Sequence, residues 1–388
     1  MNIALCYESV LPARGGAETY IADLARRLVR DGHAVHLYAS RWDAAALPAV
    51  VTFHRIDSPK GLRFLRPWRF GRAVLAELAK HRHDVSVGFD KTWGQDVLYP
   101  QGGLHAASQE HNLRKSRGGF GRWLARLGKW CAPAYWSFRA LERKQYLGPK
   151  PPLVVVNSRM VQGHFLQHYG IPADRLRVVH SAIDPDRFIA ANRAELRAKE
   201  RAAWGIGDAE PVGLFVAMNY RLKGLDPLLR GLAAMPKDSP LKISIVGHPK
   251  FGKYRRRAVA NGLKDRAIFL GHRSDPKSAY FAADFLVHPT FYDPCSLVVL
   301  EALACGLPVI TTRFNGASEL MDAPASGVVL DDPHDSAAMA KALSAMGDPL
   351  SRAAMSQAAR TAAEKWTFEM HYRALLAVFT DAAAGRLG

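Results

Sequence analysis

Short apolar segments alternate with helical patterns along most of this 388-residue sequence. The first apolar run, residues 2–7, leads through a loop containing Gly15 and Gly16 into a helical pattern at 17–30. Asp31-Gly32 then ends that helix before a second apolar run at 34–38. This order predicts a βαβ unit, whose strands are parallel. Parallel strands require long crossovers and a sheet that is covered on both faces.

The alternation forms two series, and a chain of this length is also too long for one core. Further strands are expected at 85–89, 153–156, 176–179, 212–217, 242–246, 267–270, 285–288 and 309–311, with helices at 225–234 and 297–304. Residues 189–204 are polar and predict a hinge or a solvated helix, and residues 353–384 predict one helix. We therefore expect an α/β protein of two doubly wound, Rossmann-like domains facing a cleft. The first domain is expected to span residues 1–188 and the second residues 189–365. Residues 366–388 are expected to form a C-terminal helix that packs back on the first domain.

Composition excludes several classes of protein. No apolar run reaches the roughly 18–20 residues of a membrane span, and the N-terminus lacks the pattern of a secretory signal. The four cysteines show no CxxC spacing and the histidines no HExxH spacing. We therefore expect a cytoplasmic chain without disulfides and with no metal site.

Positive charge is concentrated in the first half, where residues 1–190 contain 28 Lys and Arg against 15 Asp and Glu. This imbalance suggests an anionic partner. Residues 113–150 contribute ten of these cations, one acid and the tryptophans Trp123, Trp130 and Trp136. Such a segment suits an anionic membrane surface or single-stranded nucleic acid. A helix pair with its aromatic side chains packed inward is the third interpretation.

The first candidate site is the loop at Gly15-Gly16, directly before a helix. Two glycines allow close approach of the backbone, and a helix N-terminus attracts phosphate. The third glycine of a dinucleotide fingerprint is missing, so that motif is not satisfied. A plain turn remains the alternative.

The second candidate is formed by Arg221 and Lys223, just after the expected strand 212–217. Ligands of open α/β sheets bind beyond the carboxyl ends of the strands. Two cations at that place could hold a diphosphate and stabilise the charge that develops as a bond to it breaks. A solvated loop with two surface cations is the alternative.

The third and most specific candidate lies in residues 288–302. Asp293 and Glu301 could bind sugar hydroxyls, since a carboxylate accepts from two neighbouring OH groups. The N–H groups of residues 296–298 (Ser296, Leu297 and Val298) could face phosphate between them. Alternatively, Asp293 caps a helix that begins at Pro294, and Glu301 is an ordinary helix carboxylate. His105, after Gly102-Gly103, is a candidate catalytic or structural histidine.

These motifs occur in an order that resembles the retaining glycosyltransferases of family 4, which have the GT-B fold. The motifs are Gly15–Glu18, Asn157-Ser158, His180–Asp184, Lys223-Gly224 and Asp293…Glu301, followed by Gly306–Val309. Within the family, residues 87–91 and 94–97 are similar to the lipopolysaccharide core enzymes that add glucose to the inner-core heptose.

The resemblance implies a role for each candidate residue. It places Lys223 and Arg221 at the donor diphosphate, Asp293 at the donor-sugar hydroxyls and Glu301 at the ribose. It also places Gly271, His272 and Arg273 near the base, and Gly15 and Gly16 near the phosphate and the transferred sugar. The family usually has Glu at the position of Asp293 and Gly at that of Ser296.

The resulting expectation is an enzyme peripheral to the inner membrane. It would transfer a hexose, glucose from UDP-glucose, with retention, to the lipopolysaccharide core or another phosphorylated lipid-linked glycan. It would need no metal or cofactor beyond the nucleotide sugar, and would bind no nucleic acid. A GT-B sugar-nucleotide epimerase and a nucleic-acid-binding protein are the alternatives. No residue is identified as a nucleophile or catalytic base.

Overall fold

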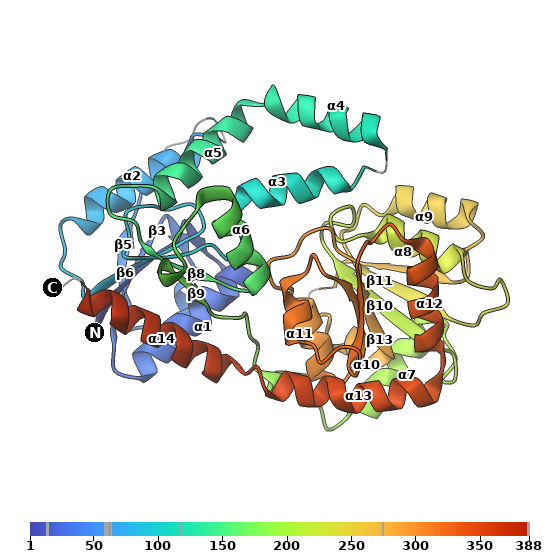
Figure 1. Cartoon of the computed structure of the whole chain (residues 1–388). Coiled ribbons are helices and arrows are strands. Elements are labelled where there is room, and N and C mark those ends of the chain that lie inside the picture. The colour runs from blue at the N-terminus through green and yellow to red at the C-terminus, as the bar shows by residue number, and fades with distance from the viewer. Residues whose placement is uncertain (13–14, 58–61, 63, 117, 274, 386–388) are drawn as a thin grey trace. The chain divides into compact units, whose positions relative to one another are not determined.

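The computed structural model describes residues 1–12, 15–57, 62, 64–116, 118–273 and 275–385. The chain divides into two compact units, one of residues 1–180 with 369–388 and the other of residues 181–368. Each unit has its own parallel sheet with helices around it (Figure 1). The expected pair of doubly wound α/β domains is confirmed.

The sheet of unit 1 has seven parallel strands in the order β5-β3-β1-β6-β7-β8-β9. Their bounds are β1 Asn2–Cys6, β3 Ala34–Ala39, β5 Thr52–Arg55, β6 Val85–Phe89, β7 Val97–Tyr99, β8 Leu153–Val156 and β9 Leu176–Val178. A short pair, β2 Ser9–Val10 and β4 Arg41–Trp42, lies outside this sheet. Strand order reverses at β1, which pairs with β3 on one side and with β6 on the other. Ligands of doubly wound sheets bind at such a reversal.

Most helices of unit 1 flank this sheet (Figure 1). The helices are α1 Gly16–Arg30, α2 Arg66–Leu78, α3 His105–Arg114, α4 Gly119–Trp130, α5 Pro133–Tyr146, α6 Arg159–Tyr169 and α14 Phe368–Ala384, with 3₁₀ turns at Ala44–Ala46 and Ala173–Arg175. The C-terminal helix α14 contacts α1, where the Tyr20 hydroxyl lies 2.7 Å from His371 Nε2. Tyr372 donates to the Arg27 carbonyl at 3.4 Å. These contacts tie the end of the chain to its beginning.

The sheet of unit 2 has six parallel strands in the order β12-β11-β10-β13-β14-β15. They are β10 Val212–Ala217, β11 Lys242–Gly247, β12 Ala267–Gly271, β13 Phe285–His288, β14 Val309–Thr312 and β15 Gly327–Leu330. The helices are α7 Arg193–Trp204, α8 Leu225–Ala233, α9 Gly252–Ala260, α10 Lys277–Ala282, α11 Leu297–Ala304, α12 Ser336–Gly347 and α13 Pro349–Glu364, with 3₁₀ turns at Pro185–Phe188 and Gly316–Leu320. Here the order reverses between β10 and β13.

Two sequence expectations need correction. The single helix expected at 353–384 is broken at 365–367, where the Phe368 N–H donates to the Ile183 carbonyl at 2.9 Å. The break coincides with the passage of the chain from unit 2 back to unit 1. Residues 189–204 contain α7, which packs against the rest of unit 2 and is not a solvated helix. Its Arg201 is fully buried and donates to the Ala282 carbonyl at 3.0 Å.

A glycine allows the loops after β10 and β13 to pack together. Gly224 has a φ of +83°, and a Cβ there would lie 2.0 Å from the Pro289 carbonyl oxygen. The Phe291 N–H also donates to the Leu222 carbonyl at 2.9 Å. The backbone at Gly224 therefore packs directly on the backbone at Pro289. Only a glycine, which has no side chain, permits this close approach.

Substituting Gly224 by Ala should destabilise unit 2 more than the backbone conformation alone explains. Gly262→Ala is the matched control, because Gly262 has a similar φ of +74° and a Cβ added there would have no atom within 4 Å. The control should cost about 1 kcal/mol, and Gly224→Ala a further ~1–3 kcal/mol from the steric clash. Scanning calorimetry measures both, and equal losses of Tm would contradict the close approach.

Candidate active site

Lys223 and Asp293 form an ion pair at the strand-order reversal of unit 2. The Lys223 Nζ lies 2.5 Å from Asp293 Oδ2, and the two side chains are only 21 % and 13 % exposed. Lys223 follows β10 and Asp293 follows β13, so adjacent parallel strands deliver the two charges to one edge of the sheet. This is the edge at which doubly wound sheets bind ligands.

The backbone fixes Asp293 from both sides. Its N–H donates to the Phe314 carbonyl, and its own carbonyl accepts from the Gly316 N–H, both at 2.9 Å. The helix-cap interpretation of Asp293 is wrong, because α11 begins at Leu297 and its N-cap is Ser296. The Asp293 carboxylate is therefore available for Lys223 and for a ligand.

His288 is a further member of this site that the sequence did not single out. It is 1 % exposed, and its Nε2 lies 3.6 Å from Asp293 Oδ2 and 3.4 Å from the Ser296 hydroxyl. Burial lowers the pKa of His288, which keeps the ring neutral. Burial alone would raise the pKa of Asp293, but the Lys223 charge and the hydrogen bond from His288 lower it below its ordinary value. Asp293 is therefore ionised at neutral pH and can accept hydrogen bonds.

Glu301 is held by a tyrosine that sequence reasoning also missed. The hydroxyl of Tyr280, a fully buried residue of α10, donates to Glu301 Oε2 at 2.5 Å. Burial raises the pKa of Glu301, and the Tyr280 hydrogen bond opposes that rise. The carboxylate is therefore oriented by a fixed donor. Nothing in the sequence spacing relates residues 280 and 301.

The three N–H groups expected to contact phosphate lie at the N-terminus of α11. The Ser296 N–H already donates to Asn315 Oδ1 at 3.2 Å, and Asn315 also accepts from the Ala317 N–H. The Ser296 hydroxyl makes no cap on the helix. The expected phosphate contact is therefore narrowed to the N–H groups of Leu297 and Val298, in the first turn of the helix.

The remaining candidates of unit 2 are Arg221, Gly271, His272 and Arg273. Arg221 and His272 are exposed, and Gly271 ends β12 with a φ of +71°. Arg273 Nη1 donates to both carboxylate oxygens of Glu200 on α7, at 3.0 and 2.9 Å. A base contact by Arg273 would therefore compete with this ion pair.

Gly15, Gly16 and His105 belong to unit 1. Helix α1 begins at Gly16 with Gly15 as its N-cap, while residues 13 and 14 of the same loop lie outside the described part of the chain. His105 begins α3, and its N–H donates to Glu142. Burial, with the charges of Lys91 and Lys129, lowers the pKa of His105 to about 4. The ring is neutral at pH 7.

Asp90 is a half-buried carboxylate that the sequence analysis did not include among the site residues. It directly follows β6, at the strand-order reversal of unit 1, with an unusual positive φ of 53°. Its Oδ1 accepts from the Gly102 N–H at 3.2 Å, and burial raises its pKa. An acid immediately after an expected strand was the available signal.

Helix α4 carries large apolar side chains that face solvent. Phe120, Trp123 and Trp130 are 74 %, 57 % and 61 % exposed, and no residue of α4 is buried. The interpretation with aromatic side chains packed inward is therefore wrong for this helix. Within unit 1, α4 stands away from the sheet (Figure 1). No helix in the described ranges is both long and apolar enough to cross a membrane.

Comparisons with known proteins match both units. Residues 14–187 match the family described as "Glycosyltransferase Family 4", and residues 197–362 match "Glycosyl transferases group 1". The chain is 25 % identical to the lipopolysaccharide glucosyltransferase WaaG of Escherichia coli over 86 % of each sequence. It is 26 % identical to a D-inositol 3-phosphate glycosyltransferase of Salinispora tropica, over 95 % of this chain and 82 % of that one.

Solved structures show the same fold. A WaaG crystal structure has a TM-score of 0.78 at 24 % identity, covering 97 % of this chain and 98 % of that one. Anabaena HepE, solved with UDP-glucose, has a TM-score of 0.69 at 20 % identity, covering 98 % and 100 %. The family matches to both units and the fold together show that the chain belongs to the family 4 glycosyltransferases of the GT-B fold.

Proposed function

We propose that this glycosyltransferase moves glucose from UDP-glucose, with retention at the anomeric carbon, to a phosphorylated lipid-linked glycan such as the lipopolysaccharide core. The observation that carries the proposal is the Lys223–Asp293 ion pair at the carboxyl edge of the unit 2 sheet. Similarity to WaaG supports the acceptor class, and the HepE complex with UDP-glucose supports the donor.

In this proposal Lys223 stabilises the leaving group. When the bond between sugar and diphosphate breaks, negative charge accumulates on the diphosphate. The Lys223 ammonium, with Arg221 and the N–H groups of Leu297 and Val298, stabilises that charge without a metal ion at the donor site. The mostly buried position of Lys223 strengthens the effect, because a charge there is less screened by water.

The two carboxylates orient the donor. Asp293 accepts from sugar hydroxyls, and its shorter side chain, relative to the usual Glu, places the acceptor oxygens closer to the backbone. Glu301, oriented by Tyr280, accepts from the ribose hydroxyls. Both roles require ionised carboxylates. The low pKa of Asp293 favours its ionised form, and the Tyr280 hydrogen bond opposes the rise in pKa that burial causes at Glu301.

Unit 1 receives the acceptor. The positive excess of residues 1–190 suits a phosphorylated glycan, and α4 suits the membrane that carries it. Because its pKa is low, His105 is a weak base. We therefore propose that His105 forms a hydrogen bond to the acceptor and does not remove its proton. Gly15 and Gly16 provide backbone approach to the transferred sugar. We assign no nucleophile.

Lys223→Ala should lower kcat about 10²–10³-fold, because the departing diphosphate loses its main cation. Lys242→Ala is the matched control, since Lys242 also pairs with a carboxylate in unit 2, Glu210, at 2.6 Å. UDP release with a phosphorylated inner-core glycolipid as acceptor measures both. Near-normal turnover of Lys223→Ala would contradict the assignment.

The alternative of a sugar-nucleotide epimerase is tested by incubating the chain with UDP-glucose and no acceptor. A glycosyltransferase should leave the UDP-glucose unepimerised.

Tyr280→Phe should weaken UDP binding about fivefold at neutral pH, because Glu301 loses its orienting donor. Without that hydrogen bond the pKa of Glu301 rises further, so affinity should fall earlier as the pH is lowered from about 8 to about 5. Calorimetric titration of UDP across this range measures the shift. Tyr254→Phe, another buried tyrosine of unit 2, is the control. An unchanged pH profile would exclude the positioning role.

The exposed face of α4 should bind anionic membranes. Combining Phe120→Ser, Trp123→Ser and Leu127→Ser should reduce binding to vesicles with anionic lipid at least about tenfold, since each side chain contributes ~1.5–3 kcal/mol when buried in the interface. Cosedimentation measures it. Leu350→Ser in unit 2, at an 81 % exposed position, is the control. Equal binding by the triple variant and the control would refute the membrane assignment.

A further inference from the structure

We propose that His54, Glu77 and His81 of unit 1 form a binding site for a divalent transition metal, with Zn²⁺ as the best fit. The inference does not depend on the donor chemistry of unit 2. Two parts of the unit supply the three residues. His54 lies on the edge strand β5, while Glu77 lies in the last turn of α2 and His81 in the turn that follows it.

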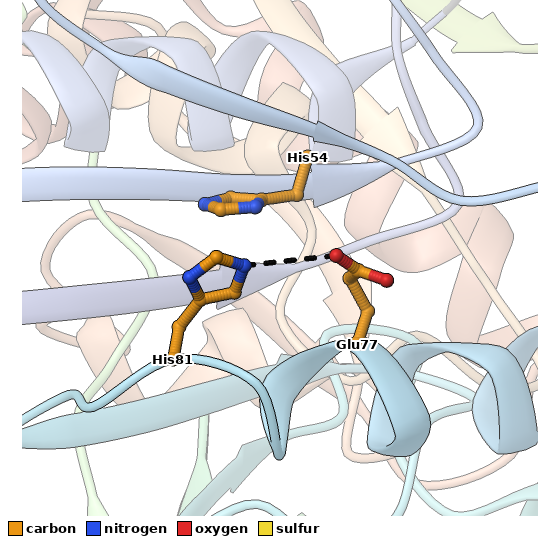
Figure 2. Close-up of side chains that lie close together, drawn as sticks. All are labelled: His54, Glu77 and His81. Atoms are coloured by element: carbon orange, nitrogen blue, oxygen red, sulfur yellow. Dashed lines mark ion pairs between the residues drawn. The ribbon is translucent and has the colours of Figure 1, made fainter.

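The ligand atoms of the three side chains already converge. One atom from each residue lies within 4.8 Å of the other two, and the His81 Nε2 is 3.6 Å from Glu77 Oε1. Figure 2 shows the His54 ring above that of His81, with the Glu77 carboxylate beside both. Tetrahedral zinc, with bonds of about 2.0–2.2 Å, holds its ligand atoms ~3.3–3.5 Å apart. Small side-chain rotations therefore close the trio around an ion.

Neighbouring groups orient His54. Its Nε2 lies 3.0 Å from Nδ1 of His36 on β3. If His54 donates its Nε2–H there, its Nδ1 lone pair remains for the metal. A metal-bound histidine usually donates its other N–H in this way. The cluster thus has an outer partner as well as ligands.

His83, although close by, is not assigned as a ligand. Its Nδ1 lies 3.0 Å from the side-chain oxygen of Asn2, which only accepts, so this nitrogen carries the proton. Its Nε2 then accepts from the Tyr38 hydroxyl at 2.8 Å. Both ring nitrogens are used, which leaves three protein ligands and a fourth position for water.

The donor set selects the ion. Two imidazole nitrogens and one carboxylate oxygen suit Zn²⁺ and related transition metals, whereas Mg²⁺ and Ca²⁺ prefer oxygen ligands. Glu77 Oε2 is held by Lys80 at 2.7 Å, so Oε1 is the oxygen that faces His81. The exposed Lys80 ammonium would lie near a bound ion and repel it. Removing the Lys80 charge should therefore tighten metal binding.

A bound ion would connect the edge strand β5 to the end of α2. His54 and Glu77 are 23 positions apart in the sequence, so the ion would close a long loop. A ligand that binds only the folded chain stabilises it in proportion to its affinity and concentration. The site therefore predicts zinc-dependent stabilisation of unit 1.

The test uses the full chain without a histidine tag. Calorimetric titration should show one Zn²⁺ per chain, and Co²⁺ should give the visible absorption of tetrahedral coordination. His81→Gln should weaken Zn²⁺ binding at least about tenfold and abolish the rise of Tm with zinc. Because His81 is exposed, this variant should fold like the parent without metal. Lys80→Gln should bind Zn²⁺ more tightly.

His168→Gln is the matched control. His168 Nε2 lies 3.7 Å from Glu110 Oε2, nearly the same as the His81–Glu77 distance, but among the described residues only the trio has a third ligand atom in range. This control should bind zinc like the parent. If His81→Gln and His168→Gln retain the same zinc affinity and stabilisation, or if the parent takes up no zinc, the site does not exist.

Discussion

The mostly buried ion pair between Lys223 and Asp293 is the interaction on which the proposed donor site depends. Both charges arrive at one sheet edge because β10 and β13 are parallel neighbours at the strand-order reversal. A buried charge is costly unless it is paired, so each residue needs the other while no ligand is bound. In our proposal, a nucleotide sugar would replace both partners: its phosphate would pair with Lys223, and its sugar hydroxyls would donate to Asp293.

Supporting residues hold the donor site in position. The backbone around Gly224 packs on Pro289, His288 stays neutral beside Asp293, and Tyr280 fixes Glu301. Each support is on a different element, yet all lie in unit 2. These contacts would preorganise the proposed donor site within unit 2, as electrostatic stabilisation of a leaving group requires. Unit 1 contributes charge and the apolar face of α4.

The sequence predicted the strands at 85–89 and 285–288 and the helix at 297–304 with the observed bounds, because buried parallel strands are continuous apolar runs. It missed β5, an edge strand with exposed and half-buried side chains. The sequence also did not predict the break at 365–367, because it lies within an otherwise helical pattern. In the structure it coincides with a hydrogen bond from Phe368 to Ile183.

Prediction of the candidate site had a similar limit. Lys223 and Asp293 were found from their places beyond strands, and Glu301 from its place in the helix that follows Asp293. The roles of His288 and Tyr280 are visible only from contacts across the fold. The cluster of His54, Glu77 and His81 is even harder to predict from the sequence. Two separate elements bring these residues together, and the spacing between residues 54 and 77 matches no local motif. Local patterns show strands and loops, but not which side chains meet.

A crystal structure of the chain with UDP-glucose tests the central claim most directly. Our account predicts diphosphate oxygens within hydrogen-bond distance of Lys223 Nζ, ribose hydroxyls on Glu301 and sugar hydroxyls on Asp293. A structure with the nucleotide bound elsewhere and the Lys223–Asp293 pair unchanged would contradict it.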